Sequence, residues 1–298
     1  MMGTILVAGR SGQVAQSLIE AGKGRSGLKI VALGRPDLDI TDADGIAHVM
    51  DAVKPDLVVN AAAYTAVDQA ETDRDAAYAG NEVGPRRLGE ASAARSLPVI
   101  HLSTDYVFGG DGDRPYQPED ETSPLGVYGA SKLAGEKALA EVNPRHVILR
   151  TAWVYGAHGK NFLKTMLRVG TDRDQLSVVA DQKGAPTSSH DIAEGILDVA
   201  EAILAAPSDA AYGTYHMTAG GEAVWADFAE AIFAASREAG GPHAAVKRIG
   251  TEDYPTPAKR PAYSVLDSSA LAEAFGVRLP HWQEPVPGIV ARVLKETN

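Results

Sequence analysis

The sequence predicts an α/β protein in which a Rossmann-like, doubly wound parallel sheet is followed by a smaller α+β portion. Through the first half, short apolar runs rich in β-branched residues alternate with longer amphipathic or alanine-rich segments. Such near-continuous apolar strands are typical of parallel sheets with both faces covered. A glycine-rich turn also joins the first run to the first helical segment, as in nucleotide-binding folds. The expected strands are Thr4–Ala8, Lys29–Leu33, Leu57–Asn60, Val99–Ser103 and Val147–Thr151.

Helices are expected wherever apolar residues recur at helical spacing between these strands. In the first half they fall near residues 13–23, 43–53, 84–96 and 127–142. In the second half the alternation loosens, with helices expected at 161–170, 190–205, 225–239, 268–275 and 285–296 and one strand at Gly213–Thr218. The proline-rich stretch 254–261 is expected to be a loop.

Composition excludes several classes of function. Of 298 residues, 45% are hydrophobic, which supplies ample material for a core, and 28 Lys and Arg against 39 Asp and Glu give a net charge of -11. The chain lacks the basic stripe of a nucleic-acid binder, and its acidity argues against an anionic membrane surface. With no cysteine and no run near the ~20 apolar residues that span a bilayer, we expect a soluble, cytoplasmic protein.

The first expected strand ends in the turn Gly9-Arg10-Ser11-Gly12-Gln13-Val14-Ala15. Glycines there allow a tight turn and close approach of the backbone to a pyrophosphate, and the following helix N-terminus offers free N–H groups. Ala15 replaces the third glycine, which only has to permit close packing of the helix on the strand. The spacing therefore indicates a dinucleotide site, although an ordinary strand–helix turn is the alternative.

The end of the second strand bears on which cofactor is bound. NAD-binding proteins usually carry an acidic residue there for the ribose 2′-hydroxyl, whereas this chain has Gly34-Arg35. Arg35, with help from Arg10, is suited to a 2′-phosphate, so NADPH is favoured and NADH remains possible. A solvated surface arginine is the alternative. Asp39 and Ile40 are expected to flank the adenine ring.

Three residues indicate the chemistry. Tyr128 and Lys132 lie four positions apart in an expected helix and so share one face. A nearby ammonium favours the phenolate form of a tyrosine, whose ordinary pKa of about 10 is poorly matched to proton transfer at neutral pH. Thr104 follows the strand Val99–Ser103, at the edge where a doubly wound sheet binds its ligand. A surface i,i+4 pair is the alternative interpretation of Tyr128 and Lys132.

These features together resemble the extended short-chain dehydrogenase/reductase superfamily and, within it, the dTDP-4-dehydrorhamnose reductases. The resemblance covers essentially the whole chain. The superfamily's shared segments are represented by 9–14, 59–68, 103–108 and 123–137. Segments 150–155, 181–187 and 254–261 lie outside that shared core and point to the reductases more sharply.

The resemblance implies reduction of the 4-keto group of dTDP-4-dehydro-L-rhamnose to dTDP-L-rhamnose, the last step of dTDP-rhamnose biosynthesis. Residues 1–155 would bind NADPH and residues 156–298 mainly the dTDP-sugar, with some segments returning to the first part. Tyr128 would protonate the developing alkoxide, Lys132 would hold the nicotinamide ribose and lower the Tyr128 pKa, and Thr104 would orient the carbonyl. Further cofactor contacts implied are Ala62, Ala63, Tyr64 and Asn81. Further substrate contacts implied are Asp105, Trp153, Asn161, Gln182, Thr187 and Arg260. For Trp153 a place in the core is the alternative, and for Arg260 a surface loop charge.

The sequence also bears on related reactions and on a metal site. Sugar-nucleotide 4,6-dehydratases carry an Asp then a Glu after the threonine, but here Asp105 precedes Tyr106, which favours net reduction. The alternatives are a reductase of another nucleotide-4-ketosugar and a non-catalytic NADP-binding subunit resembling the regulatory subunit of methionine adenosyltransferase. A Mg²⁺-linked dimer, described for some members, lacks support because Ser17 and His190 stand where acids would be wanted. No metal ligands are predicted, and the sequence does not determine the oligomeric state.

Overall fold

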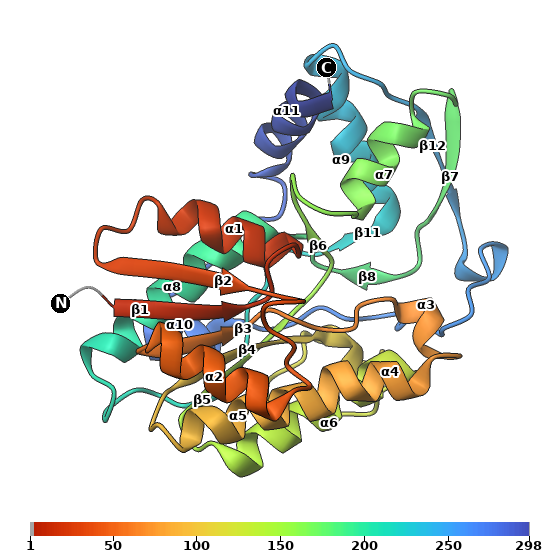
Figure 1. Ribbon diagram of the computed structural model, residues 1–298. Helices are drawn as coiled ribbons and strands as arrows, with labels where there is room; N and C mark the ends of the chain where they lie inside the picture. The colour runs from red at the N-terminus through yellow and green to blue at the C-terminus, as the bar shows by residue number, and fades with distance from the viewer. Residues whose placement is uncertain (1–2, 298) are drawn as a thin grey trace.

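A six-stranded parallel sheet forms the centre of the molecule in the computed structural model, which describes residues 3–297 (Figure 1). The strand order is β10-β5-β4-β3-β1-β2, and every neighbouring pair is parallel. All six strands therefore end at one edge, and the order reverses beside β1, where doubly wound sheets bind nucleotides. The strands are β1 Gly3–Ala8, β2 Leu28–Leu33, β3 Leu57–Asn60, β4 Val99–Thr104, β5 His146–Thr151 and β10 Gly213–His216.

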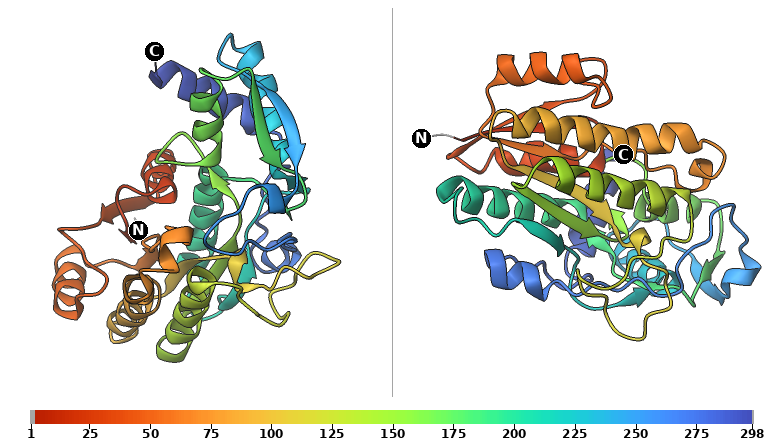
Figure 2. Two further views of the ribbon diagram at one scale, coloured as in Figure 1. Left: turned by 90° about the vertical axis from the view of Figure 1, so that its right-hand side faces the viewer. Right: turned by 90° about the horizontal axis from the view of Figure 1, so that it is seen from below.

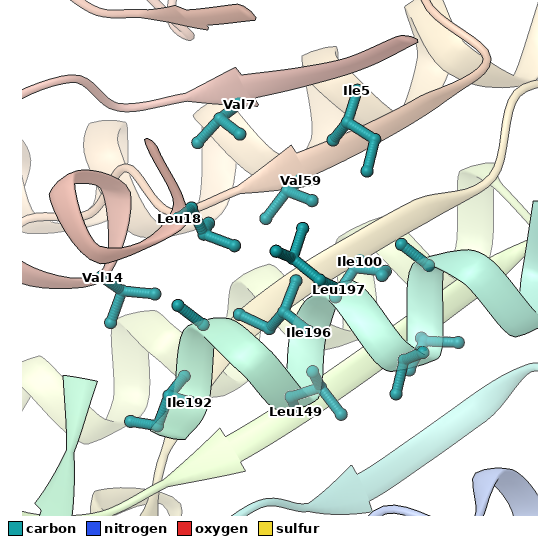
Figure 3. Packing of buried hydrophobic residues seen from close by; sticks show 14 of the residues in the cluster. Ile5, Val7, Val14, Leu18, Val59, Ile100, Leu149, Ile192, Ile196 and Leu197 are labelled. Atoms are coloured by element: carbon teal, nitrogen blue, oxygen red, sulfur yellow. The ribbon is translucent and has the colours of Figure 1, made fainter. Parts of the chain in front are cut away.

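Helices cover both faces of this sheet, because its strands carry apolar side chains on both sides. On one face α1 (Gln13–Gly22) and α8 (Ser189–Ala205) pack against inward-pointing residues such as Val7, Ile100 and Leu149 (Figure 3). On the other face α2 (Ala43–Val53), α5 (Gly84–Ala93) and α6 (Val127–Val142) cover a second cluster that includes Val99 and Ile148. Alternation along each strand thus divides its residues between two cores.

Short helices connect the strands close to their carboxyl ends. Between β3 and α5 lie α3 (Val67–Ala70), α4 (Arg74–Tyr78) and the π-helical turn η1 (Ala79–Val83), and the 3₁₀ turn η2 (Asp105–Val107) follows β4 directly. The sequence did not predict α3 and η2, because four and three residues are too few to show helical periodicity. It expected a helix only from residue 84, whereas α4, η1 and α5 run without a break over residues 74–93.

The second half builds a separate lobe on the side toward which the strand arrows point (Figures 1 and 2). Its three helices are α7 (Phe162–Val169), α9 (Trp225–Glu238) and α11 (Val286–Thr297), packed around Tyr155, Phe228 and Trp282. The lobe also contains β6 Val154–Tyr155, β7 Gln175–Val179, β8 Lys183–Gly184, β9 Thr187–Ser188, β11 Ala223–Val224, β12 Ala245–Ile249 and η3 Thr251–Asp253. The helix α10 (Ser269–Phe275) packs instead in the core of the central sheet beside β10 and α8.

The predicted fold class is confirmed. The observed helices and strands depart from the predicted ones mainly in the lobe, where short strands were not predicted. Each of the five expected first-half strands corresponds to a strand, with ends displaced by at most one residue. The two-residue strands of the lobe carry no sequence signal, because pairing between distant segments defines them. Among the described residues, no helix has both the length and the apolar character that a membrane crossing requires.

Candidate active site

The glycine turn has the geometry that a dinucleotide site requires. Gly9 has a φ of 118°, and a Cβ there would come within 3.2–3.3 Å of the Ala61–Ala62 backbone. Gly12 is the N-cap of α1, where no side chain caps the helix and no acidic residue stands in the first turn. A Cβ on Gly12 would meet no atom within 4 Å. The turn therefore leaves open space and free N–H groups at the positive end of α1.

Side chains around the turn connect it to both halves of the chain. Arg10 forms an ion pair with Asp37, 2.8 Å apart. Gln13 donates to the carbonyl oxygen of Val154 at 3.4 Å and accepts from Asn161 at 2.8 Å. Asn161 also caps α7 by accepting from the Lys164 N–H, so it joins the lobe to the glycine turn.

The end of β2 presents Arg35 to solvent, as the NADPH hypothesis requires. Asp39 accepts hydrogen bonds from the Thr41 N–H and hydroxyl, both at 2.8 Å. These bonds and the nearby charge of Arg35 lower the pKa of Asp39. Ile40 is buried, at 7% exposure, so it forms the floor of this corner rather than an open contact.

The segment after β3 is held in place by Asn81, which is fully buried in η1. Its amide accepts from the Tyr64 N–H at 2.8 Å and donates to the Tyr64 carbonyl and to the Ser131 hydroxyl, each at 3.0 Å. Ala62, Ala63 and Tyr64 are thereby tied to the helix that carries Tyr128. The Asn81 side chain is bonded to protein, so its influence on a cofactor runs through this segment.

Tyr128, Lys132 and Thr104 converge at the carboxyl edge of the sheet. Thr104 is the last residue of β4, and its hydroxyl is hydrogen-bonded with Tyr128 in the first turn of α6. Lys132 is 2% exposed and donates from Nζ to the Leu102 carbonyl at 2.6 Å. A strand end and a helix start, 24 residues apart in the sequence, therefore meet as the spacing predicted.

Burial dominates the electrostatics of this group. It raises the pKa of Tyr128 to about 12. The hydrogen bond with Thr104 acts to lower this pKa, and the charge of Asp105 raises it further. Burial also lowers the pKa of Lys132 to about 8, while the Glu136 carboxylate acts in the opposite direction. Lys132 contributes no lowering of the Tyr128 pKa in the chain by itself, where desolvation of the phenolate outweighs the hydrogen bond with Thr104.

Asp105 follows Thr104 directly and is 2% exposed. Burial raises the pKa of Asp105 to about 6, although hydrogen bonds from the hydroxyls of Ser264 and Thr104 act to lower it. The Thr104 hydroxyl is 3.0 Å from Oδ1 of Asp105. Ser264 was missed by sequence reasoning, because it arrives from a loop 159 residues further along the chain and belongs to no recognisable motif.

Trp153 has a positive φ of 46° and stacks on Trp225, with ring centroids 3.6 Å apart and planes 4° from parallel. Gly184 leaves room for the indole, since a Cβ there would lie 2.5 Å from the ring. Trp225 donates to the Gln182 side chain at 3.2 Å, and Gln182 donates to Thr251 at 2.9 Å. Gln182 therefore supports the tryptophan pair from behind and is itself 7% exposed.

Two other predicted substrate residues, Thr187 and Arg260, differ in their burial and in their hydrogen-bond partners. Thr187 is fully buried, and its hydroxyl donates to Ala185 at 2.9 Å and accepts from the Ala219 N–H at 3.3 Å. It leaves no hydroxyl facing a ligand in this conformation. Arg260 is partly exposed and forms an ion pair with Asp68 of α3, 2.9 Å apart, and Asp68 also accepts from the Ala258 N–H. This pair fixes the proline-rich loop against the first half.

No group of three or more Asp, Glu or His side chains in the range 3–297 is arranged to hold a metal ion. Ser17 and Ser189, next to His190, instead share a buried hydrogen bond of 2.9 Å between their hydroxyls.

Comparison with known proteins gives one consistent family. A family model described as the RmlD substrate binding domain matches residues 2–295. A dTDP-4-dehydrorhamnose reductase of Sinorhizobium fredii is 44% identical over 98% of both chains, and that of Escherichia coli is 40% identical over 98% of this chain and 99% of its own. The structure of a Bacillus anthracis dTDP-4-dehydrorhamnose reductase in complex with NADP is 34% identical, with a TM-score of 0.89 over 97% of this chain and 99% of that one.

The resemblance inferred from the sequence motifs is therefore confirmed over nearly the full length of the chain. The chain belongs to the RmlD family, that of the dTDP-4-dehydrorhamnose reductases.

Proposed function

We propose that this chain reduces dTDP-4-dehydro-L-rhamnose to dTDP-L-rhamnose with NADPH, the last step of dTDP-rhamnose biosynthesis. The observation that carries the proposal is the convergence of Tyr128, Lys132 and Thr104 at the sheet edge that also ends in the glycine turn. The 44% identical relative named for this activity supports the choice of sugar. A cytoplasmic location is part of the proposal.

The first half fits a nicotinamide cofactor. The open space at Gly12 and the uncapped start of α1 suit a pyrophosphate, and Arg35 is exposed where a 2′-phosphate would lie. When bound, NADPH supplies a hydride to C4 of the sugar. We assign contacts along it to residues 9–14, 35, 39–40 and 62–64, with Asn81 acting through Tyr64 and Lys132 holding the ribose.

Tyr128 is the acid in the proposed reaction. Because its pKa is raised to about 12, the phenol is protonated at neutral pH and can give its proton to the sugar O4 as negative charge develops there. The Thr104 hydroxyl, already bonded with Tyr128, is placed to hold the same oxygen. The charge of Lys132 then stabilises the phenolate that remains.

The lobe and the loops supply the rest of the proposed substrate site. Asp105 would accept a hydrogen bond from a sugar hydroxyl, Trp153 would form a wall, and Arg260 would contact the diphosphate. In this proposal Asn161, Gln182 and Thr187 act indirectly. Asn161 holds the glycine turn through Gln13, Gln182 holds the tryptophan pair through Trp225, and Thr187 holds the backbone at Ala185 and Ala219. The division of work between residues 1–155 and 156–298 belongs to the same proposal.

The test is NADPH oxidation with dTDP-4-dehydro-L-rhamnose, followed spectrophotometrically. Tyr128→Phe should lower kcat by about 10²- to 10⁴-fold, because the acid is lost. Tyr212→Phe is the matched control, since that hydroxyl bonds only to the Pro207 carbonyl at the surface, and it should retain the wild-type rate. Wild-type protein that binds NADPH but turns over no nucleotide-4-ketosugar would instead indicate the non-catalytic binding subunit.

A further inference from the structure

The hydroxyl of Thr151 has no partner within the described part of the chain, although the residue is only 7% exposed. Buried hydroxyl groups are nearly always hydrogen-bonded, because leaving one unpaired costs the free energy of removing it from water. A valine has almost the same shape as threonine and would fill this place without that cost. The hydroxyl at position 151 therefore calls for an explanation.

The position of Thr151 in the sheet places it beside the catalytic group. In the pairing of β4 with β5, Thr151 lies opposite Thr104. Directly opposed residues of parallel strands point to the same face, and side chains two apart on a strand share that face. Ile100 of β4 and Leu149 of β5 point toward α1 and α8 (Figure 3). Thr104 lies four residues after Ile100 and Thr151 two residues after Leu149, so both threonines lie on that same face, at the carboxyl edge of the sheet.

The hydroxyl of Thr104 in the same layer bonds with Tyr128 and Asp105. Trp153, the proposed sugar wall, follows Thr151 by two residues. Thr151 is thus opposite Thr104, the proposed carbonyl contact, in the strand register, and two residues before Trp153, the proposed wall, in the chain.

Ser103 provides an internal comparison. It is 4% exposed, and its hydroxyl likewise lacks a partner in the described chain. It sits one residue before Thr104 and so points to the opposite face, opposite Arg150 in the register. Two unpaired hydroxyls thus occur at this sheet edge, and only Thr151 shares the face of the catalytic threonine.

We propose that the Thr151 hydroxyl is a ligand contact that forms its hydrogen bond with a polar group of the bound reactants, an oxygen of the reacting sugar or the carboxamide of the nicotinamide. This inference rests on the proposed function, since it requires the sugar nucleotide and the nicotinamide cofactor to meet at this edge of the sheet. In this proposal the Thr151 hydroxyl, unpaired in the chain alone, gains its partner when the reactants bind.

The test compares Thr151→Val with wild type in steady-state kinetics and in thermal unfolding without ligands. Loss of one buried hydrogen bond to ligand should lower kcat/KM by about 10- to 100-fold. The melting temperature should stay the same or rise, because the unpaired hydroxyl is gone. Thr151→Ser, which keeps the hydroxyl, should recover most of the kcat/KM.

Ser103→Ala is the control, because it removes an equally buried hydroxyl on the other face. It should leave kcat/KM near wild type and likewise not lower the melting temperature. Full activity of Thr151→Val would overturn the proposal, as would a fall in its melting temperature with unchanged kinetics, which would show that the hydroxyl is structural.

Titrations with NADPH and with dTDP-L-rhamnose identify the ligand group. Weaker NADPH binding by Thr151→Val indicates the carboxamide, and weaker binding of the sugar nucleotide in the presence of NADP⁺ indicates the sugar. The same titrations separate this inference from the proposed function. If wild type shows no turnover, the proposed function fails, and unchanged affinity of Thr151→Val for both probes would then reject the ligand contact independently.

Discussion

Tyr128 keeps its proton at neutral pH because burial, rather than the neighbouring ammonium, sets its pKa at about 12. That state suits a residue that must donate a proton during reduction. The pKa of Asp105 is raised by burial to about 6, so it is charged at pH 7, and its charge adds to the increase at Tyr128. At the residue scale, the site therefore favours the protonated phenol until a reacting oxygen arrives to take the proton.

Arg35 allows a prediction at the same scale. Its side chain is exposed at the end of β2, where a 2′-phosphate would distinguish NADPH from NADH. Arg35→Ala should weaken NADPH binding by about tenfold or more, because a charge-assisted hydrogen bond is lost, and should change NADH binding little. Fluorescence titration with both cofactors measures this, and Arg173→Ala, at an exposed arginine in the lobe, is the control. Equal weakening of the two cofactors would contradict a contact with the 2′-phosphate.

At the scale of elements, α6 holds the site because its neighbours fit it closely. Its first N–H group, that of Val127, donates to Glu71 at 2.9 Å, and its middle packs against η1. Gly135 makes that approach possible, since a Cβ there would lie 1.8 Å from the Asn81 carbonyl oxygen. The π-helical turn, the segment after β3 and α6 are therefore one packed unit.

Gly135→Ala should destabilise the protein by about 3 kcal/mol, because backbone must move to admit the methyl group. Gly288→Ala is the matched control. This glycine is exposed in α11, a Cβ there meets nothing within 4 Å, and alanine should stabilise the helix by about 0.5 kcal/mol. Urea unfolding measures both variants. A Gly135→Ala protein as stable as wild type would refute the close packing of α6 on η1.

At the scale of the whole molecule, the net charge of -11 is compatible with anionic ligands because only a few local donors are needed to bind a phosphate. In the proposed function the start of α1, Arg35 and Arg260 would supply such donors in an otherwise acidic chain. The halves are also joined by charge, since Arg292 of α11 forms two hydrogen bonds of 2.7 Å with Glu20 of α1. His158 completes this group, 3.0 Å from Glu20.

This junction should give the stability a defined pH dependence. The hydrogen bond from Arg292 lowers the pKa of Glu20 from 4.5 to about 2, with burial opposing and His158 assisting. A lowered carboxyl pKa stabilises the fold above the unfolded value of 4.5, and this contribution is lost as the pH falls toward 2. Because the pair is partly exposed and screened, Glu20→Gln should cost about 1 kcal/mol at pH 7.

Urea unfolding at pH 7 and pH 3 measures this effect. The difference between wild type and Glu20→Gln should narrow at pH 3, whereas Glu273→Gln, at an exposed glutamate of α10, should match wild type at both. A difference that is constant with pH would show that the carboxylate charge of Glu20 does not stabilise the junction.

Much of the fold, and the meeting of Tyr128, Lys132 and Thr104 at one edge, was predictable because the sequence signals for them are local. Apolar runs define β1 to β5, a glycine spacing marks the turn into α1, and an i,i+4 spacing puts Tyr128 and Lys132 on one face. Thr104 was predictable as well, since the parallel sheet brings every strand end to one edge. The contacts assigned to individual ligands remain predictions.

The sequence by itself determined the fold class and the family, and it predicted residues for the chemistry, because each is encoded in short-range patterns or in a motif. Only the tertiary structure decided which side chains face a ligand and which support from behind. It buried Gln182 and Thr187, paired Arg260 with Asp68, brought Ser264 to Asp105 and left the Thr151 hydroxyl unpaired. These contacts join segments far apart in the chain, and their burial sets the pKa values, so no local pattern specifies them.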